Sequence, residues 1–342
     1  MSGDKDGKTA GKAGETPQDS NFEDEFDSAL DAARQELSRQ AAVSQLRVKR
    51  LESWEGASSL VKEFRPVPWL VWQVVRGVFG KKDIIGSPHP QAFSVLDRLI
   101  TQAAVDPSFE TSFSGATTKV PLSDAVGELG PDVAGALCYI HAICRRVGHL
   151  VAERIWRPII DDALIRARIG YYVGGYCKPF GRGRGMLAGF SGRSGLAILI
   201  ASGDLEQAKQ ILEALATGVD INEAGLRIYS CEPLQVAALT LTASGCARDA
   251  ALGTSSFSDD GEGIELGTEK ERSEQYRWLA AFSICELLRI GKADLVKEDH
   301  WRALFITQAL KEEILAKVKI LNRRGHSWAW ITWPQVAMER SS

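Results

Sequence analysis

Apolar residues at helical spacing, with no strand-like alternation, are the feature that most constrains the fold of this 342-residue chain. Leu205, Ala208, Ile211, Leu212 and Leu215 recur at intervals of three and four, and several other stretches show the same pattern. Such spacing places apolar side chains on one face of an α-helix. No alternation of period two persists, and no strand–helix repeat occurs. The sequence therefore predicts an all-α fold, a compact bundle of many helices.

The composition is that of a globular protein, with 44% hydrophobic and 25% charged residues and a net charge of −3. There is no basic excess of the kind that binds a nucleic acid polymer. No apolar run reaches the roughly 20 residues of a transmembrane segment, and residues 1–20 lack the apolar core of a signal peptide. The six cysteines then favour reduced thiols over disulfides. We expect a cytoplasmic protein.

The chain divides into four predicted parts. Residues 1–22 are polar and of low complexity, which predicts a disordered tail. Residues 23–62 carry a narrow apolar stripe and predict an amphipathic helical extension that docks on a partner or on the main domain. The main helical domain is expected at residues 63–325, and a tryptophan-containing tail at residues 326–342.

Within the main domain, helix signals and glycines predict the local structure. A glycine-rich loop is expected at residues 174–185, and a mobile acidic loop at residues 253–272. The expected helices cover residues 93–100, 123–130, 132–146, 151–172 with an interruption at Pro158, 204–216, 230–244, 276–290, 298–305 and 310–321.

The segment Gly189–Gly195, GFSGRSG, precedes an apolar run at 196–201 and is expected to begin a helix. Because glycine has no side chain, Gly189, Gly192 and Gly195 would let neighbouring helices approach closely. Arg193 lies among these glycines and would be free to meet an anion or a partner.

Four stretches, in order, carry a resemblance to a known family. They are VPLSDAVGELG at 120–130, RIWRPIIDDALIRA at 154–167, AGFSGRSGLAILI at 188–200 and the helix pair at 223–250. With these stretches the chain resembles the HDOD family, bacterial signalling domains related to HD-type phosphohydrolases, over roughly residues 90–320. The resemblance implies an HD/HDOD-like helical bundle preceded by a helical extension and a disordered tail.

The departures from this family bear on activity. A catalytic HD site needs a histidine, an adjacent His–Asp pair and a distal aspartate, which hold two cations that activate water. By the resemblance, the first histidine position is Arg157, and the His–Asp positions are Gly192 and Arg193. Glycine offers no side-chain ligand, and arginine repels a cation. We therefore expect a degenerate site with no metal, no cofactor and no catalytic residues.

These observations favour a non-catalytic signal-transduction or scaffolding module, a pseudoenzyme that acts through other signalling proteins. The partner class follows from the family resemblance alone. One alternative is a diverged metal-dependent HD-type phosphohydrolase. Another is a membrane-surface adaptor that uses the segment 69–82, where tryptophans lie beside basic residues.

Arg182 and Arg184 alternate with glycines in GRGRG, and Arg193 follows shortly after. Arginines and free backbone amides at the start of a helix can bind an anion, such as a nucleotide effector. A flexible connector with solvated charges is the favoured interpretation, since neither a P-loop nor a dinucleotide motif is present.

Two aromatic clusters have two interpretations each. Trp69, Trp72 and Phe79 lie on one side of a short helix, which favours core packing but also suits a membrane or partner contact. Trp328 and Trp330, with Trp333, either cap the domain or anchor a partner.

Cys138, His141, Cys144 and His149 share one predicted helix. A tetrahedral zinc site usually takes ligands from more than one element, and these four residues spread over a broad arc. The favoured interpretation is that the cysteines belong to the core.

Overall fold

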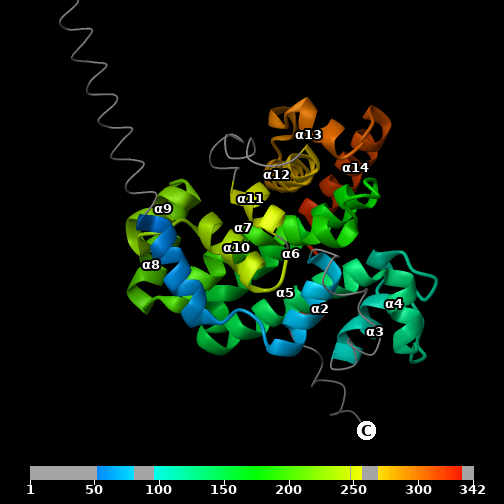
Figure 1. Ribbon diagram of the computed structural model, residues 1–342, viewed down its shortest axis with the longest axis horizontal. Helices are drawn as coiled ribbons and strands as arrows, with labels where there is room; N and C mark the ends of the chain where they lie inside the picture. The colour runs from blue at the N-terminus through cyan, green and yellow to red at the C-terminus, as the bar shows by residue number, and fades with distance from the viewer. Residues whose placement is uncertain (1–51, 81–95, 247, 256–268, 333–342) are drawn as a thin grey trace, which may run out of the picture. The chain divides into compact units, whose positions relative to one another are not determined.

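The computed structural model describes residues 52–80, 96–246, 248–255 and 269–332 (Figure 1). Predictions for the tail at 1–22, for 23–51 of the extension, for Lys81 and Lys82, for 256–268 of the acidic loop and for Trp333 lie outside the described residues. Every regular element within the described ranges is helical, and no strand occurs there. The predicted all-α fold is confirmed.

The helices follow one another along the chain in the order α2 (Trp69–Phe79), α3 (Asp97–Val105), η2 (Pro107–Phe109), α4 (Leu122–Leu129), α5 (Pro131–Leu150), α6 (Glu153–Gly175), α7 (Arg182–Ser202), α8 (Leu205–Ala216), α9 (Ile221–Tyr229), α10 (Pro233–Ala243), α11 (Arg248–Ser255), α12 (Glu269–Arg289), η5 (Ala293–Leu295), α13 (Glu298–Ala303), α14 (Gln308–Arg324) and η6 (Trp328–Ile331). A further helix covers residues 53–64.

Helix α7 forms the centre of the core and contacts α5, α6, α10 and α12 (Figure 1). Its length and apolar composition would suffice to cross a membrane. However, 83% of its most apolar 18-residue stretch is buried inside the molecule. A helix that is hydrophobic all round is the expected core helix of such a bundle. Burial thus accounts for the composition of α7.

The contact between α6 and α7 depends on glycine. A Cβ atom placed on Gly170 of α6 would collide with the backbone oxygen of Gly185 on α7, and a Cβ on Gly185 would collide with the backbone oxygen of Gly170. One turn further along α7, a Cβ on Gly189 would collide with the backbone oxygen of Arg166. The two backbones therefore approach so closely that only glycine, which has no Cβ atom, fits at these positions.

The glycine-rich segment is mostly helical, not the loop predicted at residues 174–185. Helix α6 continues to Gly175 and α7 begins at Arg182, so the connector is confined to residues 176–181. Gly181 has φ +87°, a conformation that favours glycine and reverses the chain between the helices. Most of the glycines here serve helix packing, which is why their density misled the loop prediction.

The predicted helix start at Gly189–Gly195 is also corrected, because these residues lie inside α7. Their predicted role in close helix approach is confirmed. Gly189 faces the backbone of α6, Gly192 faces Phe282 on α12, and Gly195 faces the backbone at the start of α10. One heptapeptide thus brings three helices against α7.

Pro158 does not interrupt α6, contrary to the prediction. A proline removes the hydrogen bond to the carbonyl four residues earlier, here Arg154. Both Pro158 and Arg154 are exposed. Water can therefore satisfy the freed carbonyl, and the helix continues.

Parts of the predicted extension and tail belong to the core. Ala57 and Val61 of the extension are buried in it, and the Ser53 hydroxyl accepts a hydrogen bond from Gln235. At the other end, Trp328 is fully buried in the 3₁₀-helix η6. Helix α12 likewise begins at Glu269, within the predicted acidic loop.

We predict that Gly185→Ala lowers the free energy of unfolding by about 3 kcal/mol, because α6 and α7 must move apart to admit a methyl group. The control is Gly127→Ala on α4, where a Cβ meets no atom within 4 Å. That change should raise stability by up to about 1 kcal/mol through helix propensity. Urea denaturation measures both. If Gly185→Ala unfolds with the same free energy as the wild type, the close contact between α6 and α7 is contradicted.

Candidate functional site

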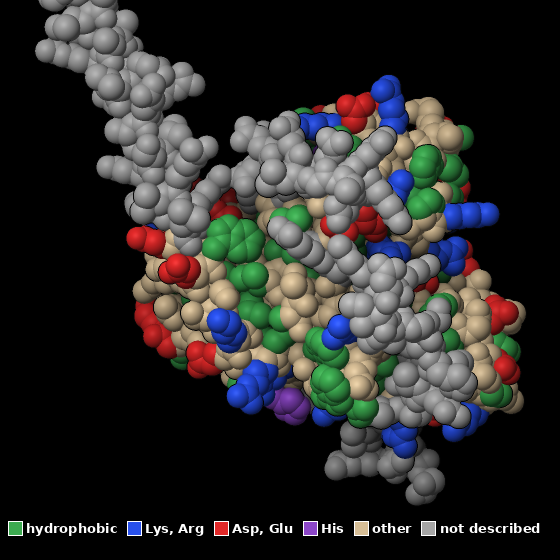
Figure 2. Space-filling model, viewed as in Figure 1, with side chains coloured by type: hydrophobic (Ala, Val, Ile, Leu, Met, Phe, Trp, Pro, Cys, Tyr) green, Lys and Arg blue, Asp and Glu red, His purple; other side chains and the backbone are tan. Residues whose placement is uncertain are grey.

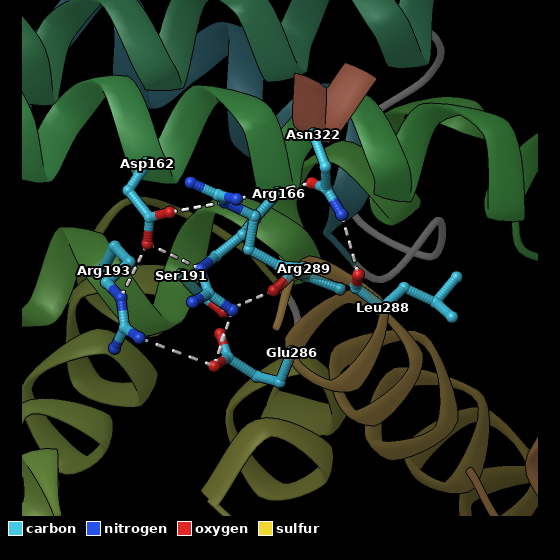
Figure 3. Close-up of polar contacts among 9 residues, drawn as sticks. Asp162, Arg166, Ser191, Arg193, Glu286, Leu288, Arg289 and Asn322 are labelled. Atoms are coloured by element: carbon cyan, nitrogen blue, oxygen red, sulfur yellow. Dashed lines mark hydrogen bonds and ion pairs between the residues drawn. The ribbon is translucent and has the colours of Figure 1, made fainter. Parts of the chain in front are cut away.

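Charged side chains from α6, α7 and α12 meet where these three helices pack together (Figure 3). Asp162 and Arg166 come from α6, Arg193 from α7, and Glu286 and Arg289 from α12. The close contact of α6 and α7 brings Arg193 opposite Asp162. We call these five residues the arginine–carboxylate cluster.

Asp162 is the centre of the cluster. Its Oδ2 atom lies 2.9 Å from Nε of Arg166 and 2.9 Å from Nε of Arg193. Its Oδ1 atom lies 2.6 Å from Nε of Arg289. One carboxylate thus accepts charge-assisted hydrogen bonds from arginines on all three helices.

Glu286 is the second carboxylate of the cluster. Its Oε2 atom lies 2.7 Å from Nη1 of Arg166 and 4.0 Å from Nη2 of Arg193. Arg166 and Arg193 therefore both bridge Asp162 and Glu286. The side chain of Arg166 is 2% exposed, so its charge depends on these carboxylates for compensation.

The cluster extends toward α14 through Asn322. The Oδ1 atom of Asn322 accepts a hydrogen bond from Nη1 of Arg289 at 3.4 Å. Its Nδ2 atom donates to the backbone oxygen of Leu288 at 3.0 Å (Figure 3). Asn322 therefore ties the end of α12 to α14.

The charges of the cluster favour an anionic Asp162. Burial pushes the pKa of Asp162 upward, but the charges of Arg166 and Arg193 outweigh burial and bring this pKa to about 2. Three guanidinium groups face two carboxylates, which leaves the cluster with one net positive charge. Such a cluster repels a cation.

The residues at this site do not fit a metal ion. Both carboxylates of the cluster already bind arginines, and the position expected for a metal-binding pair holds Gly192 and Arg193. No group of three or more His, Cys, Asp and Glu side chains in the described part of the chain is arranged to hold a metal.

Arg157, the expected first position of the degenerate site, lies outside the cluster. It is half-exposed and pairs with Glu153 and Asp161 on its own helix. The residue of α6 that meets Arg193 is Asp162, five positions further along. On α6 it is thus Asp162, and not Arg157, that lies opposite Arg193.

The predicted anion site at Arg182 and Arg184 has partners from within the chain. Arg182 donates from Nη1 to the Tyr171 hydroxyl at 2.7 Å, and Arg184 pairs with Glu274 at 3.4 Å. Asp132 accepts the backbone N–H of Gly183 at 2.8 Å, so a carboxylate of the chain already occupies the start of α7. A pocket of about 350 Å³ adjoins these residues.

The N-terminal aromatic cluster is partly on the surface. Trp69 is 64% exposed and stacks on Trp72 with ring centroids 4.9 Å apart. Phe79 is buried against α5, so it is not a surface contact. The face drawn in Figure 2 carries Lys and Arg as well as Asp and Glu, interspersed with hydrophobic side chains.

Trp328 and Trp330 cap the domain. Trp328 is buried, stacks on Phe109 with centroids 4.9 Å apart, and donates from Nε1 to the Ser108 hydroxyl. Trp330 donates from Nε1 to Asp106 at 2.8 Å. Of the two interpretations of this cluster, the structure favours the cap over the partner anchor.

The cysteines are core residues, as expected. All six are buried and unpaired with one another. Burial raises the pKa of the Cys138 and Cys144 thiols, which keeps them protonated. His141 instead contacts the backbone oxygen of Ile331 at 2.6 Å.

Sequence reasoning missed Asp162, Arg166, Glu286 and Arg289 as site residues. A signal was present for Arg166 and Glu286, because each is a charged residue within an apolar helical run. A buried charge is nearly always paired, so each such residue predicts a partner elsewhere in the fold.

No protein-family model matches the sequence, and no curated protein matches it. Solved structures with a similar fold include a candidate signal transduction protein from Marinobacter aquaeolei VT8, with 15% identity, 77% of this chain covered and a TM-score of 0.55. This chain spans 59% of that protein. A candidate phosphohydrolase from Shewanella amazonensis SB2B shares 15% identity over 77% of this chain and 93% of its own length, with a TM-score of 0.50.

An HDOD domain protein of unknown function from Geobacter sulfurreducens also aligns, with 16% identity, 78% of this chain and 95% of its own length covered, and a TM-score of 0.49. At these identities the likeness concerns the fold. The chain thus shares its helical fold with the Marinobacter and Shewanella proteins.

We predict that Asp162 makes stability depend on pH in acid. Its pKa is lower in the folded chain than in the unfolded one, so its ionised form stabilises the fold above about pH 4. This contribution, about 2 kcal/mol, is lost as the pH falls toward about 2. The measurement is the difference in free energy of unfolding between wild type and Asp162→Asn, which should shrink across that range. If the difference between the two proteins stays constant across this range, ionised Asp162 is not the source of the pH dependence.

Proposed function

We propose that this chain is a non-catalytic signalling or scaffolding module, in which arginine side chains take the place of the metal centre of an HD-type hydrolase. The observation that carries the proposal is the position of Arg193. It stands where the resemblance places the aspartate of the metal-binding pair, and its guanidinium reaches both Asp162 and Glu286.

Charge compensation gives the physical reason. A divalent cation would add two positive charges to a cluster that already carries one, and it would have to displace arginines from Asp162 and Glu286. Removing one partner of a buried pair leaves an uncompensated charge and costs about 3–5 kcal/mol. These costs disfavour binding of a metal ion, and with it a metal-activated water, at this position.

A module of this kind acts through partners. We propose that these are other bacterial signalling proteins and that the chain works in the cytoplasm. The name of the Marinobacter fold neighbour, a candidate signal transduction protein, supports the signalling role. A nucleotide effector has weaker support, since Arg182 and Arg184 have partners within the chain.

Two alternatives each have an observation in their favour. The Shewanella fold neighbour is a candidate phosphohydrolase, and two carboxylates do meet at the cluster, so a diverged hydrolase is the second candidate. The exposed Trp69, beside the half-exposed Leu70, favours a membrane-surface adaptor. Sedimentation with anionic lipid vesicles distinguishes this last function.

The proposal predicts that the full chain, dialysed separately against Mn²⁺, Fe²⁺ or Mg²⁺, holds no more metal than Asp162→Asn/Glu286→Gln. Hydrolysis of bis(p-nitrophenyl) phosphate and of cyclic dinucleotides should stay at the rate without protein. Elemental analysis and a chromogenic assay measure the two quantities. Stoichiometric metal that the double variant loses, together with hydrolysis, would establish the hydrolase instead.

A further inference from the structure

A groove runs between the end of α12, η5 and α14. It has a volume of about 710 Å³, and its apolar lining includes Leu288, Ala293, Leu315 and Val318. This size is within the range of ordinary binding pockets. The groove lies apart from the expected anion site at Arg182 and from Trp69.

Exposed aliphatic side chains accompany the groove. Ile320, which lines it, is 49% exposed. Ile290, next to the lining Gly291 in the chain, is 53% exposed, and Leu295, two residues after the lining Ala293, is 57% exposed. Exposed hydrophobic patches in folded proteins commonly mark interaction sites. Over α13 and α14, Figure 2 shows hydrophobic side chains beside both basic and acidic ones.

The charge of the groove has one sign. Lys319 and Arg323 are the titratable side chains that line it, and both are exposed. Among described residues, the ion pairs of α14 involve Lys311 and Lys317, whereas Lys319 and Arg323 have no acidic partner. The groove thus offers an apolar floor with two unpaired cations at its edge.

We infer that this groove binds an acidic amphipathic helix of a partner protein, an inference that rests on the proposed action through partners. The apolar face of such a helix would cover Leu315, Val318 and Ile320. Its carboxylates would pair with Lys319 and Arg323. Leu315, Val318, Lys319, Asn322 and Arg323 follow the helical spacing that presents one continuous face to a helix laid in a groove.

The groove also borders the arginine–carboxylate cluster. Asn322 lines the groove and accepts a hydrogen bond from Arg289, which in turn binds Asp162. A helix seated in the groove would therefore contact the residue that ties α14 to the cluster.

The test is fluorescence anisotropy with two labelled helical peptides and the full chain. Both peptides carry leucine at i, i+3, i+4 and i+7, and one has glutamate and the other lysine on the polar face. We expect the chain to bind the glutamate peptide, and added salt to weaken this binding. Lys319→Glu/Arg323→Glu should weaken it by roughly tenfold or more.

The matched control is Lys178→Glu/Arg227→Glu, which changes the net charge equally at exposed residues away from the groove. It should bind as the wild type does. Ile320→Ser, which removes apolar surface without changing charge, should weaken binding of the glutamate peptide by roughly tenfold.

The inference is wrong if the chain binds neither peptide or both equally, or if Lys319→Glu/Arg323→Glu binds like the control. Any of these results would leave the metal and hydrolysis assays unchanged. A wrong inference about peptide binding in the groove can therefore be distinguished from a wrong proposal that the chain is non-catalytic.

Discussion

The backbone contact between α6 and α7 is the constraint on which the rest of the structure depends. Gly170 and Gly185 let each helix touch the other's carbonyl, and Gly189 does the same at Arg166. With the backbones this close, the side chains of Asp162 and Arg193 face each other across the pair. Gly192 then admits α12, which contributes Glu286 and Arg289.

The same packing accounts for the character of the site. Helices this tightly packed leave little water to solvate a charge, so each buried charge needs a partner of opposite sign. Arginine meets this need at three positions, with geometry that suits a carboxylate. The result is an ionic junction of three helices at the position that the resemblance assigns to the metal-binding pair.

Much of the fold could be predicted from the sequence. Helical periodicity gave the helices near Leu205–Leu215 and Leu310–Leu321 almost as the structure has them. Local composition gave a wrong prediction where one pattern fits two structures. The many glycines at 174–185 indicated a loop, but glycines four residues apart also form the contact face of a helix.

The site was harder to predict because it depends on the rotation of one helix against another. Arg157 and Asp162 are five residues apart on α6, which is about 140° around a helix, so one faces solvent and the other faces Arg193. A resemblance of motifs does not resolve an offset of this size. Glu286 and Arg289 lie more than a hundred residues further along, and only tertiary packing brings them to Asp162.

The central claim is that the Arg193 guanidinium stands where the fold would otherwise hold a metal. A crystal structure of the full chain grown with Mn²⁺, with anomalous diffraction measured at the manganese edge, tests it most directly. The account predicts Arg193 in contact with Asp162 and no anomalous peak between Asp162 and Glu286. A manganese peak bound by these two carboxylates, with Arg193 turned away, would contradict it.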